Sequence, residues 1–289
     1  GIKGSVFDAE GKGYIQGAFS GAKAITYGLL ANTQKGGNWV ARTPEQTVTY
    51  ASCHDNATLY DRLVASLGGE YTNRYDDYIK RNKLSSAITF SSQGTAFILA
   101  GEEFARTKLG DHNSYQSPPD LNMLDWERTL EYGDLVSYYK GMIEFRNYYA
   151  PVRTPVALDG VTTEYNKDTG VIQMVYADQN FDWENVVFLF NANEEAQTVT
   201  LADFEKTDGY IVAIEIRPFA KLGEGTVFTI PSGQENTAAD YSVNLYKDGY
   251  KVFIELPNAD KPTGLEYADG KVIGLDADEN YKYAQFNIN

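Results

Sequence analysis

The sequence predicts an α/β region over residues 1–150 and an all-β region, a β-sandwich, over residues 151–289. In the first region, apolar runs of strand length alternate with segments whose apolar residues have helical spacing. In the second, short β-type runs follow one another between turn residues. The charge differs too: residues 1–150 contain 17 acidic and 15 basic residues, whereas residues 151–289 contain 23 and 10. We therefore expect two domains.

Helices and strands alternate in the first region. The helical segments are GAKAITYGLL (21–30), LYDRLVASL (59–67), NRYDDYIKRNKLSSAITFSS (73–92) and LVSYYKGMIEFRNYY (135–149), the last ended by Pro151. Two apolar runs, TVTYAS (47–52) and TAFILAG (95–101), are expected to be buried strands of a parallel sheet or barrel. Each leads directly into a polar cluster, and parallel α/β folds expose their active sites at the carboxyl ends of such strands.

The second region is expected to be built from strands alone. Its β-type runs are GVIQMVYA, NVVFLFNAN, QTVTLADF, GYIVAIEI, GTVFTI, YSVNLY, GYKVFIEL and YKYAQFNIN. Residues after about 235 are expected to form either an extension of the sandwich or an extra β module.

Composition narrows the function classes. Forty acidic and 25 basic residues give a net charge of −15, which disfavours binding to nucleic acid or to an anionic membrane surface. No apolar stretch is long enough to cross a membrane, and the N-terminus does not look like a signal peptide. The missing initial Met is compatible with a processed or cloned fragment, and the compartment stays open. With one cysteine, no G-x-G-x-x-G or Walker sequence and no recognisable calcium-ligand spacing, we expect no cofactor; calcium is possible but has no motif to support it.

The sharpest polar cluster is Cys53-His54-Asp55-Asn56, at the end of the first apolar run. His54 can donate to sugar hydroxyls, and the Asp55 carboxylate can oppose positive charge that develops at an anomeric carbon. The alternative is that Asp55 caps the helix that follows, because Asp is a good N-cap residue. Cys53 is expected to be a packed small residue rather than a nucleophile.

Two further clusters follow the second apolar run. Glu102, Glu103 and Arg106 can orient a polyol substrate, or they form a surface ion pair. The loop that follows contains amide, hydroxyl, carboxylate and aromatic side chains suited to carbohydrate, whose C–H face stacks on rings; they are His112, Asn113, Ser114, Tyr115, Asp120, Asn122 and Trp126. The alternative is a turn-rich loop packed by Trp126.

Four segments in order carry a family resemblance: IKGSVFDAEGKGYIQG, TVTYASCHDNATLYDRL, QGTAFILAGEEFARTK and HNSYQSPPDLNMLDW. Together they resemble the closing third of type I pullulanases, which are debranching members of the α-amylase glycoside hydrolase family. The resemblance covers residues 1 to about 150. It implies the C-terminal part of a (β/α)8 TIM barrel followed by a β-domain, and retaining hydrolysis of α-1,6 branch points in α-glucans.

The resemblance also implies residue roles. Asp55 would be the carboxylate that stabilises the transition state, and His54 would donate to sugar hydroxyls, with Asn56 beside them in the same motif. Asn113, Ser114, Tyr115 and Asp120 would line the cleft. Glu102, Glu103 and Arg106 would follow the last barrel strand.

The family's two covalent-catalysis carboxylates are missing from these residues. In the family they come from motifs at strands four and five, upstream of the His-Asp motif, and neither motif occurs here. Asp8 lacks the arginine that accompanies the nucleophile, and Glu102 and Glu103 lie downstream of Asp55. Because the retaining mechanism needs both groups, we expect the 289 residues alone to be inactive and to need the N-terminal part of the enzyme as a partner. The alternatives are a non-catalytic α-glucan-binding module and a truncated homologue with a structural role.

An incomplete barrel should leave an open apolar face. The two predicted strands are apolar on both faces, as barrel strands are when helices cover one side and the barrel interior the other. We therefore expect Val48, Tyr50, Phe97 and Leu99 to border an exposed apolar surface in the isolated chain.

Overall fold

The computed structural model describes most of the first 199 residues and several strands beyond them. It covers residues 1–8, 10–37, 39–53, 55–177, 180–181, 185–195 and 197–199, and after these the backbone of strands 211–216, 226–230, 241–245, 252–255, 265–268 and 271–274. Within this part of the chain, no helix is long and apolar enough to cross a membrane.

The helices predicted from apolar spacing are confirmed. The α-helices are α1 (Ala22–Leu29), α2 (Leu59–Leu67), α3 (Asp76–Ser91), α4 (Pro119–Asn122), α5 (Arg128–Glu131) and α6 (Gly133–Tyr148). Short 3-10 helices span Tyr14–Gln16, Phe19–Gly21, Pro44–Gln46, Glu102–Phe104, Ser114–Gln116 and Ala150–Arg153. The two four-residue helices and the 3-10 turns were not predicted, because segments this short show no apolar period.

The two strands of the first region are much shorter than predicted. Only β1 (Val48–Thr49) and β2 (Thr95–Ala96) pair, in parallel, with Val48 opposite Thr95. The Phe97 amide still donates to the Thr49 carbonyl at 3.0 Å, but no further strand is paired with β1 or β2 among the described residues. Each strand of a parallel sheet forms hydrogen bonds with its neighbours. Because β1 and β2 have no other neighbouring strand among the described residues, only two residues of each are paired.

The open face expected beside these strands is present. Val48 is 55% exposed, Tyr50 48% and Phe97 42%, and the rings of Tyr50 and Phe97 meet edge to face with centroids 5.9 Å apart. Leu99 is half-buried. Large apolar side chains of this kind are normally covered in barrel strands, so this surface is unusually apolar for the chain on its own.

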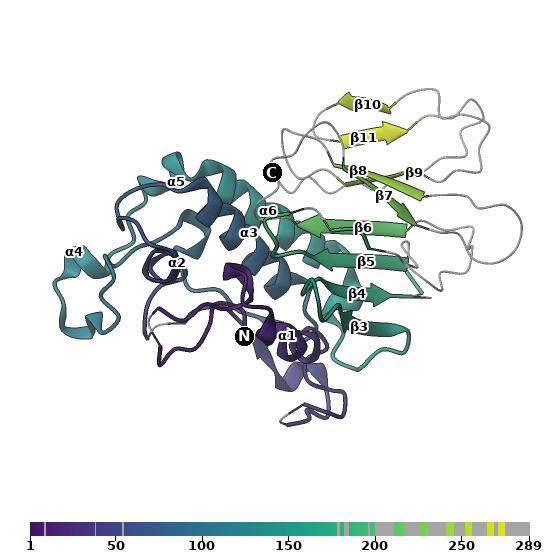
Figure 1. Ribbon diagram of the computed structural model, residues 1–289, viewed down its shortest axis with the longest axis horizontal. Coiled ribbons are helices and arrows are strands. Elements are labelled where there is room, and N and C mark those ends of the chain that lie inside the picture. Colours follow the sequence, from purple (N-terminus) through teal and green to yellow (C-terminus); the bar gives the residue numbers. More distant parts are fainter. Residues whose placement is uncertain are drawn as a thin grey trace, which may run out of the picture.

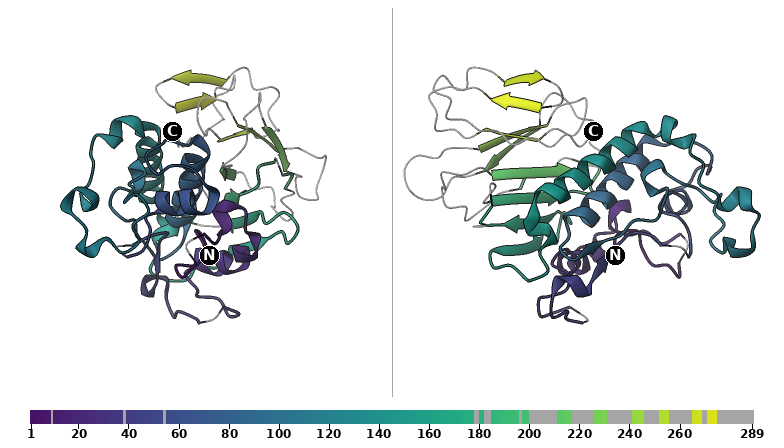
Figure 2. Two further views of the ribbon diagram at one scale, coloured as in Figure 1. Left: turned by 60° about the vertical axis from the view of Figure 1, so that its left-hand side comes forward. Right: turned by 180° about the vertical axis from the view of Figure 1, so that it is seen from behind.

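A helical layer separates the strand-end region from a second sheet. Helices α3 and α6 run side by side, with β3–β6 along one side of them and α2 on the other, as Figure 1 shows and Figure 2 confirms from behind. The α3 sequence is largely polar, yet almost every residue from Tyr78 to Ser91 is buried. Its position between two layers explains this, because both sides of the helix are covered.

The β region begins with a four-stranded sheet. Strands β3 (Val161–Tyr165), β4 (Ile172–Tyr176) and β5 (Asn185–Phe190) are antiparallel, and β6 (Ile211–Ile216) pairs in parallel with β5. A three-stranded antiparallel sheet follows, made of β7 (Thr226–Ile230), β8 (Tyr241–Leu245) and β9 (Val252–Glu255), and a hairpin of β10 (Leu265–Ala268) and β11 (Lys271–Gly274) completes the described strands.

Most of the predicted β runs therefore coincide with strands. QTVTLADF is an exception, because residues 197–199 are not a strand and the rest of it lies outside the described residues, as does YKYAQFNIN. Strands β3, β10 and β11 were not predicted. The sandwich arrangement and the extra module after about 235 stay predictions.

One apolar core joins the helices to the β3–β6 sheet. It extends from Leu63 on α2 and Leu84 on α3 to Phe145 on α6 and Phe188 on β5. The rings of Phe145 and Phe188 are 5.4 Å apart, edge to face. The predicted boundary at residue 150 thus runs through a shared core, and the division into two domains stays a prediction.

Candidate functional site

The turn after β1 carries the first predicted cluster. Asp55 is exposed, Asn56 is half-buried in a left-handed conformation with φ +65°, and Cys53 is a half-buried free thiol. Asn tolerates this backbone conformation better than most residues. His54 lies outside the described residues.

The alternative that Asp55 caps α2 is wrong. The N-cap is Thr58, whose hydroxyl accepts a hydrogen bond from the Asp61 amide at 3.0 Å. Both residues are good caps in principle, but the left-handed turn at Asn56 delays the start of the helix until Leu59. The Asp55 carboxylate is thus not used to start the helix, and it lies at the surface.

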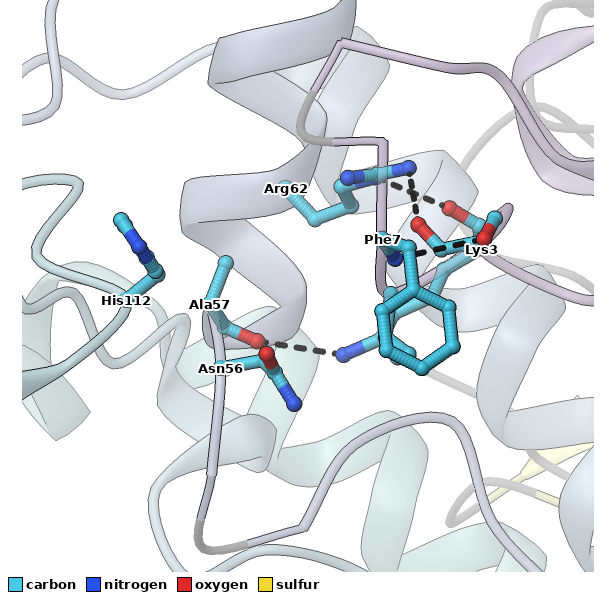
Figure 3. A pocket seen from close by; sticks show the side chains of 8 residues that line it. Lys3, Phe7, Asn56, Ala57, Arg62 and His112 are labelled. Carbon is cyan, nitrogen blue, oxygen red and sulfur yellow. Dashed lines mark hydrogen bonds between the residues drawn. The ribbon is translucent and has the colours of Figure 1, made fainter.

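A pocket of about 150 Å³ lies beside this turn. It brings the N-terminal segment against the Asn56–Ala57 backbone and the loop after β2, as Figure 3 shows. Its lining consists of Lys3, Ser5, Val6, Phe7, Asn56, Ala57, Arg62 and His112. Two cations, an amide, an aromatic ring and an imidazole therefore surround one space next to Asp55.

Two buried cations hold the walls of this pocket. The Lys3 ammonium donates to the Ala57 carbonyl at 3.1 Å, and the Arg62 guanidinium donates to the carbonyls of Lys3, Ser5 and Gly11 at 2.6 to 3.1 Å. Burial lowers the pKa of Lys3 to about 8, and the nearby Glu102 carboxylate partly opposes this. Neither residue was predicted. The burial of Arg62 could have been predicted from helical spacing, because it stands three residues after Leu59 and so lies near the buried face of α2.

Glu102 is buried between the segment that follows β1, α3 and α6. Its carboxylate accepts hydrogen bonds from the hydroxyls of Ser52 and Tyr139, and its backbone carbonyl accepts one from the Asn82 amide at 3.0 Å. Only 4% of the residue is exposed. Burial raises the pKa of Glu102 to about 7. This burial argues against the predicted contact of Glu102 with substrate and favours a role in fixing Ser52, three residues before Asp55.

The other two members of that cluster use backbone partners. Glu103 is half-buried and accepts from the Gly101 amide at 2.9 Å, and the Arg106 guanidinium donates to the carbonyls of Ala100 and Asn122. In the described part of the chain Arg106 forms no ion pair with either glutamate. The surface ion pair considered as an alternative is therefore absent there, and Arg106 ties the end of β2 to the following loop.

The loop of residues 111–122 separates into an inner and an outer set. Ser114 is buried and accepts from the Lys108 ammonium at 2.7 Å. Asn113, Tyr115 and Asp120 are exposed, Tyr115 to 76%. Ser114 therefore belongs to the loop's internal support, whereas the other three remain free to meet a ligand.

The Trp126 ring leaves most of its surface open. It is 63% exposed, and its contact with the chain is a tilted approach to the Phe104 ring at 5.6 Å. Trp126 therefore packs against the chain with only part of its ring, so the alternative of a packed loop holds only in part. Exposed rings at Tyr115 and Trp126 are of the kind that stack on sugars. No group of His, Cys, Asp and Glu suited to a metal ion occurs among the described residues.

Comparison with known proteins gives one consistent relationship. No protein-family profile matches the chain. It is 28% identical to the pullulanase of Bacillus subtilis over 68% of this chain and 27% of that protein. It is 38% identical to the chloroplastic Pullulanase 1 of Arabidopsis thaliana over 30% of this chain and 9% of that protein.

Solved structures agree. The pullulanase of Bacillus acidopullulyticus superposes with a TM-score of 0.65 and 26% identity, covering 84% of this chain and 28% of that one. The pullulanase of Paenibacillus barengoltzii, in a complex with maltohexaose and α-cyclodextrin, gives 0.65 and 31%, covering 71% and 32%. The chain thus spans about a third or less of each relative. In sequence and in fold it is similar to the C-terminal portion of type I pullulanases.

Proposed function

We propose that the chain is the C-terminal part of a retaining α-glucan debranching hydrolase that cleaves α-1,6-glucosidic branch points. The observation that carries the proposal is the exposed Asp55 carboxylate at the carboxyl end of a parallel strand, beside a loop with exposed amide, carboxylate and aromatic side chains. A parallel α/β fold uses this edge for catalysis. The similarity to pullulanases supports the substrate class.

The Asp55 carboxylate stabilises the positive charge that develops on the sugar in the transition state. Hydrolysis of a glycoside passes through an oxocarbenium-like transition state, and a fixed carboxylate nearby lowers its free energy more than that of the neutral substrate. His54 and Asn56 donate to hydroxyls of the same sugar. Asn113, Tyr115, Asp120 and Trp126 bind neighbouring sugars of the glucan.

The nucleophile and the acid–base carboxyl come from another part of the enzyme. Two carboxyl groups roughly 5 Å apart are required for the retaining mechanism, and the family motifs that hold them do not occur in these 289 residues. The same part of the enzyme covers the open face at Val48, Tyr50 and Phe97. Because parallel strands continue a ladder at both edges, β1 and β2 offer it two edges for pairing.

Two assays of pullulan hydrolysis test the proposal. The purified 289 residues should release no reducing ends above the blank, whereas a longer polypeptide that also holds the two carboxyl motifs should release them. In that polypeptide Asp55→Asn should lower kcat roughly 100-fold or more with little change in KM, because its interaction strengthens only in the transition state. Asp168→Asn, an exposed carboxylate in the turn between β3 and β4, is the matched control. Turnover by the 289 residues, or unchanged kcat in Asp55→Asn, would refute the proposal.

A second candidate is a non-catalytic α-glucan-binding module, favoured by the exposed rings of Tyr115 and Trp126. Calorimetric titration of the 289 residues with maltohexaose separates the two. Binding that is lost in Tyr115→Ala and Trp126→Ala, together with an inactive longer polypeptide, would favour the module.

A further inference from the structure

Asp61 on α2 holds the segment that leads into the 111–122 loop. The residue is fully buried, and its carboxylate accepts from the Thr107 hydroxyl and from the Lys108 backbone amide, the latter at 2.8 Å. Burial raises the pKa of Asp61, while these hydrogen bonds oppose the rise. A buried carboxylate is costly unless it is well bonded, so its placement here fixes Thr107 and Lys108 against α2.

Lys108 carries this attachment into the loop itself. The residue is 8% exposed, and its ammonium donates to the Ser114 hydroxyl at 2.7 Å. That hydroxyl donates in turn to the Asn122 side-chain carbonyl at 2.8 Å, and the Asn122 amide donates to the Ser114 backbone carbonyl at 2.7 Å. The two ends of the loop are thereby closed on one buried cation.

The charge of Lys108 also interacts with the Asp55 carboxylate in the turn after β1. Burial lowers the pKa of Lys108, and the carboxylates of Asp61, Asp111 and Asp55 oppose this, whereas Arg106 adds to it. Asp61 lies on the helix that starts four residues after Asp55. The chain therefore leads from the Asp55 turn into α2, and the hydrogen bonds of Asp61 join α2 to Lys108 and the start of the loop.

We infer that Asp61 and Lys108 are positioning residues that hold the loop of residues 111–122 at a fixed distance from the turn carrying Asp55. The effect on catalysis rests on the proposed function, whereas the effect on loop order does not. With the loop held, its exposed side chains present one surface to the glucan. Without the ammonium, the Ser114 hydroxyl, which also donates to Asn122, loses its donor, and the loop samples other conformations.

Hydrogen exchange in the 289 residues tests the loop directly. Asp61→Asn and Lys108→Met should each raise amide exchange over residues 111–122 about tenfold, with α3 and α6 unchanged, because local opening depends on local contacts. Ser114→Ala removes the hydroxyl that accepts from Lys108 and donates to Asn122 but leaves Asp61 and its partners intact, so it should give a rise similar to that of Lys108→Met and confined to the loop. Lys140→Met, an exposed lysine on α6, is the control. Unchanged exchange in the loop, or an equal rise throughout the chain, would overturn the inference.

Kinetics on the longer polypeptide test the catalytic consequence. Lys108→Met should raise KM for pullulan roughly tenfold and change kcat far less, because the loop binds substrate in the ground state and transition state alike. A fall in kcat at constant KM, or no change in either, would contradict positioning. If wild-type polypeptide shows no turnover, the proposed function fails, and the exchange measurement still decides whether the loop is held.

Discussion

The chain has two apolar surfaces, one buried by its own residues and one exposed. Where α6 meets the β3–β6 sheet, Phe145, Tyr149 and Phe188 are almost fully buried against one another. At the β1–β2 pair, Tyr50 and Phe97 touch only edge to face and remain 48% and 42% exposed. The first surface is completed by the chain's own residues, and the second is not. The contrast separates residues that stabilise this chain from residues that, in the proposed function, another part of the enzyme covers.

The largest expected effect comes from one substitution made on both surfaces. Phe145→Ala removes a ring with no exposed surface and should lower the free energy of unfolding by about 3–5 kcal/mol. Phe97→Ala should lower it by clearly less, about 1–2 kcal/mol, because 42% of the residue is already exposed. Urea unfolding followed by circular dichroism measures both. Equal losses would remove the distinction between the surfaces.

Glu102 lies near the exposed β1–β2 face but is itself buried. Its pKa in the folded chain, about 7, lies above its ordinary value of 4.5, so the folded state keeps a proton that the unfolded state releases. Its contribution to stability is therefore full below pH 4.5 and is lost as the pH rises to 7, by about 3 kcal/mol.

The Glu102→Gln variant should lack this loss. Urea unfolding of both proteins between pH 4.5 and 7 gives the difference between their stabilities, in which the titrating groups that do not interact with Glu102 cancel. If the stabilities of the two proteins changed in the same way with pH, Glu102 would be in contact with water and not buried.

A smaller effect distinguishes Asp55 from the helix cap next to it. Thr58→Ala should cost about 1 kcal/mol, because the first turn of α2 loses the acceptor for the Asp61 amide. Asp55→Ala should cost less than Thr58→Ala in the same thermal unfolding assay, because Asp55 is exposed and is not the N-cap. A loss in Asp55→Ala as large as in Thr58→Ala would return Asp55 to a structural role.

Local patterns predicted the helices well and the strands less well. The apolar spacing of 59–67 coincides with α2, since one helical face is set by the local sequence alone. The runs 47–52 and 95–101 became two-residue strands, because strand length depends on partners that no local pattern specifies. The exposure of Val48, Tyr50 and Phe97 was predicted correctly from the same two-sided apolar pattern.

The roles of the site residues stay predictions, and the structure describes their surroundings. Asp55 lies in the turn after β1, and the loop with Asn113 and Asp120 follows β2 in the chain. Thr58 rather than Asp55 caps α2, Ser114 points inward, and Glu102 is buried, because these outcomes depend on tertiary contacts. The buried charges of Lys3, Asp61 and Lys108 were missed for the same reason: their partners come from segments far away in the sequence.

Hydroxyl-radical footprinting with mass spectrometry tests the central claim most directly, namely that the β1–β2 face is an interface with the rest of a debranching enzyme. In the isolated 289 residues, the rings of Tyr50 and Phe97 should be oxidised readily, and the ring of Phe145 should be protected. In the longer polypeptide that supplies the two carboxyl motifs, Tyr50 and Phe97 should become as protected as Phe145. Equal oxidation of Tyr50 and Phe97 in both polypeptides would contradict the account.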